Sequence, residues 1–367
     1  MSISKYLINP LPKYNRLFYN QKGWIGADGS YSVKLSNNTT IWLYGDTLIG
    51  NIINDKRQIT TMINNSIALQ YGKNPLTADV KFFWKTTQDG KAMSFVVPTD
   101  NSGWFWPCDG IVIENKLYIF FAQIITKDDE KDEHPVSPFE FKVIGTWLVE
   151  IENPLDNPVV WQIKQHKIPW GRFSANSNMF FGSALLKDKD SVYIYGYNEN
   201  QTQEANERNM TVARVPANKM TDFAQWRFFD GTDWQTDITR ITNLFSGIAT
   251  EYSISYQPAT KQYIAIYSEN GMSRNIIARF SPTPIGPWSE PCKLYEYSEC
   301  NWHQNYFCYA AKGHPAISTK DNEIIITYAC NSMNPYQLSQ DTRIYWPRFL
   351  NVNIKKAKEI VDKKYKK

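Results

Sequence analysis

The sequence predicts an all-β protein, a five-bladed β-propeller that forms a single domain. Of the 367 residues, 15% are aromatic, and β-branched residues are frequent, a composition typical of sheets. Five segments share one plan: a small or polar residue, a short strand, a polar turn and a second strand rich in Tyr and Ile. They begin roughly 60–80 residues apart along the whole chain. Repeated antiparallel hairpins are typical of propellers, whose usual blades have about 40–50 residues.

The five repeats start near residues 26, 107, 182, 251 and 313. They read GADGSYSVKL…TIWLYG, CDGIVIENKLYIFFAQI, GSALLKDKDSVYIYGYN, EYSISYQPATKQYIAIYSE and GHPAISTKDNEIIITYACN. Most are followed by a third strand, such as GTWLVEIENP or MTVARVP, which would extend the hairpin outward. We therefore expect one closed domain over residues 1–354, with the extra length in loops on one face. A strand near Tyr6–Phe18 or Phe349–Ile354 should complete the last blade.

The last residues, 355–367, read KKAKEIVDKKYKK and form a basic tail. Such a run is typical of a solvated terminus, either a short helix or a frayed end. The other basic residues are spread along the chain, and the formal net charge is only +4. This mild charge argues against nucleic acid as a partner.

No run approaches the ~20 apolar residues of a membrane span, and the start of the chain has no apolar core of signal-peptide length. We therefore expect no membrane partner, and localisation stays open between the cytoplasm and export by another route. The five cysteines are an odd number and their spacing fits no standard zinc pattern. We expect no metal and no cofactor, and a monomer; the disulfide state is left open.

Two aspartates flank the first hairpin, Asp28 before its first strand and Asp46 after its second. The ends of a hairpin lie side by side, so the two carboxylates should be near neighbours. Two carboxylates in one place repel, and the pKa of one tends to rise. The simpler interpretation is that both are turn residues beside glycines, and the hairpin alone does not exclude it.

In a propeller the first strand of each blade lines the central channel and starts at the mouth where ligands bind. The residues at the five starts are Asp28, Asp109, Ser183, Glu251 with Tyr252, and His314. Glycoside hydrolysis needs one carboxylic acid to protonate the leaving oxygen and a second carboxylate to attack the sugar or to activate water. The candidate catalytic residues are therefore Asp28, Asp46, Asp109 and Glu251.

Aromatic residues precede two of these acids. The stretches GWIGADG and GWFWPCDG place Trp24, Trp104 and Trp106 just before Asp28 and Asp109. Sugars stack their C–H faces on flat rings, so the three tryptophans are candidate substrate-binding residues, although each is individually as well explained by packing.

Four more residues are candidates for substrate binding. Tyr252 stands next to Glu251, and Asn331 closes the hairpin of the fifth blade as Asp46 closes that of the first. His314 would hydrogen-bond a sugar hydroxyl, or be a packed structural histidine. Arg274 would bind an anionic substrate, although a surface salt bridge is the simpler explanation.

Three stretches carry a family resemblance: GADGSYSVKL…IWLYGDTLIG, WPCDGIVIENKLYIFF and EYSISYQPATKQYIAIYS…IIARFSPTPIGPW. They resemble a bacterial family of five-bladed propellers, formerly known only as a domain of unknown function, that includes endo-D-arabinanases. The likeness covers about residues 20–352. It implies that Asp28 and Asp46 are the catalytic pair.

More distantly, the chain resembles the furanosidase propellers that cut arabinans and fructans with one acid on each of blades 1, 2 and 3. Asp28 and Asp109 match the first two acids. Ser183 stands where the third would be, and the comparable glutamate is Glu251 on blade 4. This departure favours the Asp28/Asp46 pair over a scheme with three acids.

The sequence thus predicts a glycoside hydrolase that acts on a furanose-containing, arabinan-like or related polysaccharide. The alternative is a non-catalytic propeller that binds glycan or protein, because a fold does not determine a function. The two hypotheses differ in whether Asp28 and Asp46 converge without a neutralising Lys or Arg.

Overall fold

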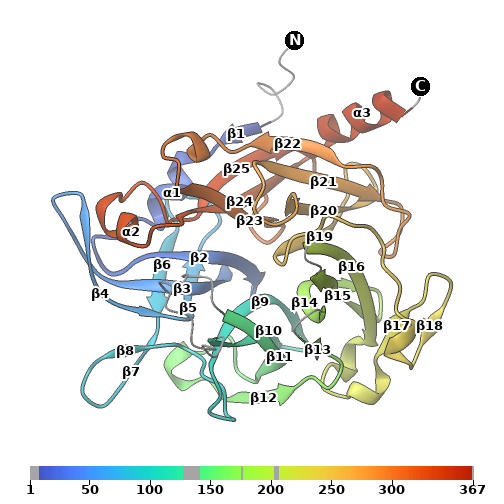
Figure 1. The fold of residues 1–367 in the computed structure, drawn as a ribbon, viewed down its shortest axis with the longest axis horizontal. Coiled ribbons are helices and arrows are strands. Elements are labelled where there is room, and N and C mark those ends of the chain that lie inside the picture. Colours follow the sequence, from blue (N-terminus) through green and yellow to red (C-terminus); the bar gives the residue numbers. More distant parts are fainter. Residues whose placement is uncertain (1–7, 127–140, 175–176, 202–205, 366–367) are drawn as a thin grey trace.

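The computed structural model describes residues 8–126, 141–174, 177–201 and 206–365. Its five main antiparallel sheets stand around a common axis as the blades of a propeller, which confirms the predicted fold (Figure 1). One innermost strand per blade lines the axis. In blade order these strands are β2 (Lys22–Lys34), β9 (Trp104–Ile113), β14 (Ser177–Asp188), β19 (Tyr252–Gln257) and β23 (Tyr306–Gly313).

Each innermost strand pairs with the next strand of the chain, so every blade grows outward by hairpins. Blade 1 adds β3 (Thr39–Ile53), β4 (Lys56–Ile63), β5 (Ser66–Tyr71) and β6 (Asp79–Phe83). Blade 2 adds β10 (Lys116–Thr126), β11 (Phe141–Ile151) and β12 (Ile163–Lys167). Blade 3 adds β15 (Ser191–Gln201), β16 (Asn206–Pro216), β17 (Arg227–Phe229) and β18 (Trp234–Gln235), with β13 (Arg172–Phe173) on the other side of β14. Blade 4 adds β20 (Gln262–Ser268), β21 (Asn275–Ser281) and β22 (Cys292–Glu296). A separate ribbon of β7 (Lys85–Thr86) and β8 (Ala92–Met93) follows blade 1.

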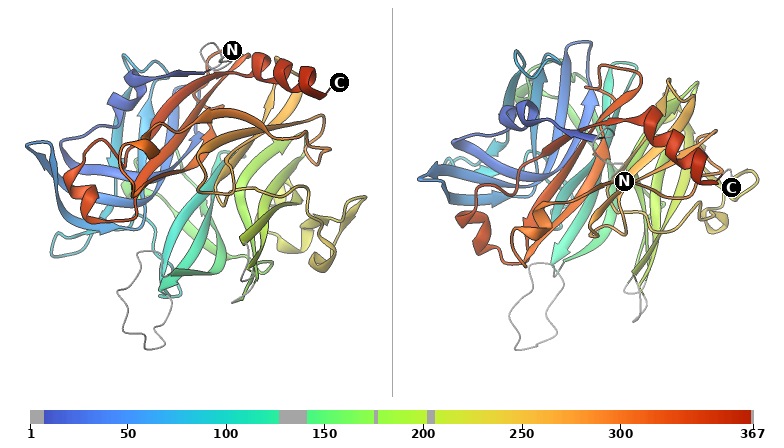
Figure 2. Two further views of the ribbon diagram at one scale, coloured as in Figure 1. Left: turned by 45° about the horizontal axis from the view of Figure 1, so that its top comes forward. Right: turned by 90° about the horizontal axis from the view of Figure 1, so that it is seen from above.

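Blade 5 is built from both ends of the chain. It adds β24 (Glu323–Ser332) and β25 (Arg348–Asn353), and its outermost strand is β1 (Ile8–Pro10), which pairs antiparallel with β25. Helix α1 (Pro12–Leu17) then leads the chain into blade 1. Pairing of the first strand with the last blade closes the ring, and Figure 2 shows the blue start of the described chain beside the red strand of blade 5.

The fifth repeat begins earlier than the sequence predicts. The pattern places its start near residue 313, but β23 has already run from Tyr306 and ends at Gly313. The next residues, from His314 on, form the turn to β24, with the amides of Ile317 and Ser318 bonded to the carbonyl of His314. Pro315 has no N–H for a strand ladder, which explains why the strand stops before it.

The basic tail is a packed helix, α3 (Ile354–Tyr365). Ala357 and Val361, four positions apart, are buried against the blade, whereas Lys355 and Lys356 are exposed. The segment is thus amphipathic, and one of its faces extends the core. No helix of the described residues is long and apolar enough to cross a bilayer.

The connection between β24 and β25 is fastened to blade 1 by a buried arginine. It contains helix α2 (Tyr336–Gln340), and Arg57 at the start of β4 donates hydrogen bonds to its main-chain oxygens. The acceptors are the carbonyls of Leu338, Asp341 and Ile344, and a fourth bond reaches Ile25 on β2. The guanidinium also stacks 4.7 Å from the ring centroid of Trp346. These bonds hold the connection, and the Tyr345 it carries, over the channel side of blade 1.

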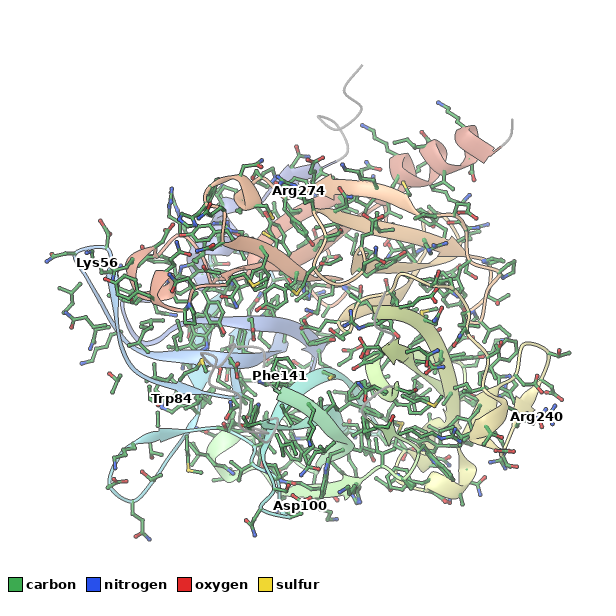
Figure 3. All side chains as sticks on the ribbon, in the orientation of Figure 1. Lys56, Trp84, Asp100, Phe141, Arg240 and Arg274 are labelled. Carbon is green, nitrogen blue, oxygen red and sulfur yellow. The ribbon has the colours of Figure 1, made fainter. Side chains whose placement is uncertain are left out.

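Replacement of this arginine should destabilise the protein. Arg57→Met removes the donors of four buried or half-buried carbonyls, so we expect the free energy of unfolding to fall by about 2–4 kcal/mol, measured by urea denaturation. Lys56→Met is the matched control, because Lys56 is exposed at the outer end of the β3–β4 hairpin (Figure 3). It should change stability by no more than about 0.5 kcal/mol. Equal losses in the two variants would contradict the assigned role.

Candidate active site

Asp28 and Asp46 meet where the ladder between β2 and β3 is irregular. The register of the two strands shifts three times between Trp24 and Tyr31, on both sides of Asp28. Such bulges re-aim side chains that a regular strand would hold in alternation. Gly45 makes room for the result, since a Cβ there would lie 2.5 Å from Oδ1 of Asp28. The carboxyl of Asp28 therefore rests against the main chain next to Asp46.

Asp28 receives a hydrogen bond from blade 5. The hydroxyl of Tyr309 on β23 donates to Oδ2 over 2.6 Å. Burial raises the pKa of Asp28 well above its usual value, and the negative charges of Asp46 and Glu251 raise it further. The Tyr309 bond favours the ionised form and opposes them. Repulsion between the carboxyls and loss of solvent outweigh this donor, so Asp28 tends to hold a proton.

Asp46 has a different set of partners. Its Oδ1 accepts hydrogen bonds from Nε1 of Trp106, at 2.7 Å, and from Nδ2 of Asn64, at 3.2 Å. Burial raises the pKa of Asp46 to about 6, and these two donors work against that rise. The hydroxyl of Tyr345 donates to the main-chain oxygen of Asp46 over 3.0 Å. Neither Asp28 nor Asp46 forms an ion pair with a Lys or Arg of the described residues.

Asp109 links blade 2 to blade 3. Its Oδ1 accepts from the amide of Gly110 at 2.8 Å, and its Oδ2 from the amide of Leu185 on β14 at 2.7 Å. Burial raises the pKa of Asp109 to about 7, although the two amide donors lower it. Both oxygens are thus occupied by main-chain donors, which suits a residue that joins two blades at the channel.

Glu251, just before β19, contacts a buried lysine. Its Oε1 lies 3.5 Å from Nζ of Lys312, and the side chain is 23% exposed. The charges of Glu251 and Lys312 both act on Asp28, the first raising and the second lowering its pKa. Four carboxyl groups from three blades therefore share one part of the channel with one ammonium group.

Three predicted substrate-binding residues lie inside the protein. Trp24 is 1% exposed and donates from Nε1 to Ser66, and Tyr252 is fully buried with its hydroxyl on the carbonyl of Gly196. His314 is 1% exposed, and its ring nitrogens lie 2.7 Å from Oγ of Ser32 and 2.6 Å from Oγ1 of Thr327. These three side chains pack between strands, and the structure does not bring them to the mouth. The early end of β23 accounts for His314, which follows the innermost strand instead of starting it.

Trp104, Trp106 and Asn331 are half-buried near the carboxyls. Trp106 meets Phe141 edge to face, with ring centroids 4.6 Å apart, and Trp104 lies 6.1 Å from Trp106. Nδ2 of Asn331 donates to the Tyr309 hydroxyl over 3.2 Å, so Asn331 supports the partner of Asp28.

Arg274 is exposed on the connection between β20 and β21, and it bonds to the side chain of Asn301. In Figure 3 it lies outside the channel, so the structure separates it from the carboxyls.

Four further residues of the site are not predicted from the sequence: Asn64, Tyr309, Lys312 and Tyr345. Tyr309 and Lys312 flank a bulge in β23, where the register against β24 shifts. The innermost strands of blades 1, 2 and 3 contain comparable bulges, and alignment of YAAKG with them is the signal that could have found these two residues. No local pattern marks Asn64 or Tyr345, because tertiary contacts bring them to Asp46.

The fold and the site together define a class of protein: a five-bladed propeller with carboxyl groups clustered at its channel. The chain belongs to the family described as Domain of unknown function (DUF5005), whose model matches residues 12–355. The sequence predicts a family known as a domain of unknown function, and the match agrees with that prediction. The link to endo-D-arabinanases stays a prediction. No curated protein matches the chain.

Several solved structures are similar to this chain over most of its length. A putative hydrolase from Bacteroides ovatus is similar with a TM-score of 0.72 and 18% identity, over 96% of this chain and 93% of that one. A GH43_1 enzyme from Xanthomonas citri, complexed with xylose, reaches a TM-score of 0.48 at 14% identity, over 92% and 91% of the two chains. An α-L-arabinofuranosidase from Podospora anserina reaches 0.46 at 9% identity, over 91% and 92%. At these identities the similarity to the Bacteroides protein shows the fold alone.

No group of three or more His, Cys, Asp and Glu side chains within the described ranges is arranged to hold a metal ion. The groups that the site brings together are its four carboxyls, the hydroxyls of Tyr309 and Tyr345, and the ammonium group of Lys312.

The raised pKa of Asp46 predicts a pH-dependent stability. A folded-state pKa of about 6 against about 3.9 in the unfolded chain means that the folded state binds more protons between these values. The contribution of Asp46 to stability is therefore lost as pH rises from about 4 to about 6. Asp46→Asn should be more stable than the native protein at pH 8 by about 1–2 kcal/mol, a figure reduced for partial exposure, and should gain little at pH 4.5.

Urea unfolding at the two pH values measures this difference. Asp55→Asn is the control, because Asp55 is exposed in the turn between β3 and β4, and its effect should be the same at both pH values. A gain in Asp46→Asn that did not depend on pH would show that Asp46 ionises as in a free chain.

Proposed function

We propose that the protein is a glycoside hydrolase that cuts a furanose-containing, arabinan-like polysaccharide. Asp28 is the general acid that protonates the leaving glycosidic oxygen. Asp46 is the carboxylate that attacks the anomeric carbon or activates water. This reaction needs two neighbouring carboxyls, of which one is protonated and the other ionised at working pH.

The observation that carries the proposal is the difference between the two environments. The pKa of Asp28 is raised well above its usual value by burial and by the charges of Asp46 and Glu251. Burial raises the pKa of Asp46 to about 6, and the hydrogen bonds from Trp106 and Asn64, which stabilise its ionised form, oppose this rise. Paired titratable groups whose surroundings separate their pKa values are typical of an acid and its partner base or nucleophile.

The surroundings of the pair support a carbohydrate substrate. Trp106 bonds to Asp46 and stands in contact with Phe141, and Trp104 adds a third half-buried ring. Sugar rings stack on such surfaces. The arabinan-like substrate class rests on the resemblance of the hairpin stretches to the propeller family that includes endo-D-arabinanases.

Asp109 and Glu251 have supporting parts in this proposal. Both oxygens of Asp109 accept main-chain amides, so it holds two blades in place and adds negative charge to the channel. Glu251 pairs with Lys312 and raises the pKa of Asp28 through its charge. Neither is given the role of acid or nucleophile.

Loss of either aspartate should abolish activity. The purified protein is incubated with a panel of arabinan, xylan, galactan and levan, and new reducing ends are counted. We expect release from arabinan, and a fall of about 10³-fold or more in kcat/KM for Asp28→Asn and Asp46→Asn, because each removes a group that acts in the transition state. Asp55→Asn, exposed on the same blade, should keep full activity.

Melting temperatures of the variants show whether a loss is chemical. Binding of a polysaccharide without any cleavage would favour the non-catalytic alternative. Cleavage that survives in either Asn variant would overturn the assigned pair.

Trp106 should tune the acidic side of the pH profile. The rate should rise as Asp46 ionises, with a midpoint of about 6, and fall when Asp28 loses its proton at higher pH. The indole N–H of Trp106 lowers the pKa of Asp46. Trp106→Phe removes it and keeps the ring, so the acidic midpoint of kcat/KM should move up by about half to one pH unit.

Trp104→Phe is the matched control for this experiment. The indole nitrogen of Trp104 is buried and has no hydrogen-bond partner among the described residues, so its removal should leave the midpoint in place. Equal shifts in both variants would mean that the ring shape, and not the hydrogen bond to Asp46, sets the profile.

A further inference from the structure

Lys312 places a buried ammonium group in the central channel. The residue is 1% exposed. Its Nζ donates to the carbonyls of Gly29, at 2.6 Å, and Ala310, at 2.7 Å, and lies 3.5 Å from Oε1 of Glu251. An ammonium carries three donors, of which two have main-chain acceptors here, and its charge is paired with that of Glu251. The ring of Tyr31 adds a cation–π contact, with its centroid 4.4 Å from Nζ. Burial of an unpaired ammonium group would cost much free energy of folding. The acceptors around Lys312 offset this cost, so the buried charge is an integral part of the channel.

The acceptors come from two bulges in neighbouring blades. Gly29 lies in the bulged part of β2 directly after Asp28, and Ala310 lies in the bulge of β23 directly after Tyr309. Both have positive φ, 79° and 58°, and their irregular backbones leave carbonyls free for the ammonium. Lys312 thereby links Gly29, which follows Asp28, to Ala310, which follows Tyr309. Tyr309 is the residue whose hydroxyl bonds to Asp28.

We propose that Lys312 is a positioning residue: a cation built into the chain that holds the Asp28 bulge in place and, with Glu251, sets which carboxyl of the site carries the proton. The inference rests on the proposed function, because it gives Lys312 a part in the work of the Asp28–Asp46 pair. Glu251 acts together with Lys312, because it brings a negative charge from blade 4 to the same ammonium group.

The two charges act on Asp28 in opposite directions. Glu251 raises the pKa of Asp28 and Lys312 lowers it, beside the larger effects of burial and of Asp46. Lys312 itself has a lowered pKa because of burial, against the charges of Glu251, Asp28 and Asp109. The titratable groups that interact with the ammonium, taken over all the strands that face it, are Asp28, Tyr31, Cys108, Asp109, Glu251 and His314.

The test is a direct titration of the aspartates. The protein is labelled with 13Cγ-aspartate, and the Asp28 signal is identified by its absence in Asp28→Asn. In Lys312→Met the titration midpoint of Asp28 should move up by about one pH unit, and in Glu251→Gln down by a similar amount. The double variant should lie between the two. Lys320→Met and Glu323→Gln each break the 3.1 Å ion pair between an exposed lysine and a half-buried glutamate, and they should leave the midpoint unchanged.

Midpoints that stay in place, or that move the same way in both variants, would overturn the proposal. Where Lys312→Met does not fold, Glu251→Gln decides alone, since a downward shift of Asp28 in that variant is required. The alkaline limb of kcat/KM on the cleaved polysaccharide should shift in step with these midpoints. If no polysaccharide is cleaved, the proposed function fails while the titration still decides the role of Lys312.

Discussion

Four carboxyl groups share the channel of this propeller with one buried ammonium group. If Asp28, Asp46, Asp109 and Glu251 were all ionised, the single charge of Lys312 would leave an excess of three negative charges. A site that burial has deprived of solvent does not hold such an excess, so protons stay bound at pH values where free carboxyls have lost them. This crowding is the constraint on which the chemistry of the site depends.

Contacts with the main chain keep the crowded carboxyl groups in place despite their mutual repulsion. Bulges in β2 and β23 supply the carbonyls that bind Lys312, and Gly45 leaves the space that the Asp28 carboxyl fills. Arg57 binds the connection between β24 and β25 through main-chain carbonyls, and that connection brings Tyr345 to Asp46. Closure of the ring by β1 keeps blades 5 and 1 together, and the site lies across that seam. Asp109, Lys312 and Arg57 are thus bonded to the main chain, which fixes the surroundings in which Asp28 and Asp46 repel each other.

The two aspartates of the pair are then distinguished by their donors. Asp28 has one tyrosine hydroxyl and faces the charges of Asp46 and Glu251, whereas Asp46 has the indole of Trp106 and the amide of Asn64. The donors come from three different blades or connections. A propeller suits this arrangement, since its innermost strands deliver one residue each to a common axis.

The pairing of Asp28 with Asp46 follows from the sequence alone, because the ends of a hairpin meet whatever surrounds it. The repeat of hairpins likewise predicts the five blades. Which side chains face the channel was decided only by the tertiary structure. Bulges break the period of two along β2 and β23, so Trp24 turns into the packing between strands, while Tyr309 and Lys312 turn toward Asp28. Tyr252 is buried at the start of β19, and His314 is buried because β23 ends at Gly313, just before it. Tyr345 and Asn64 reach Asp46 through loops whose course depends on contacts between distant segments, such as those of Arg57, and no local pattern of residues encodes such contacts.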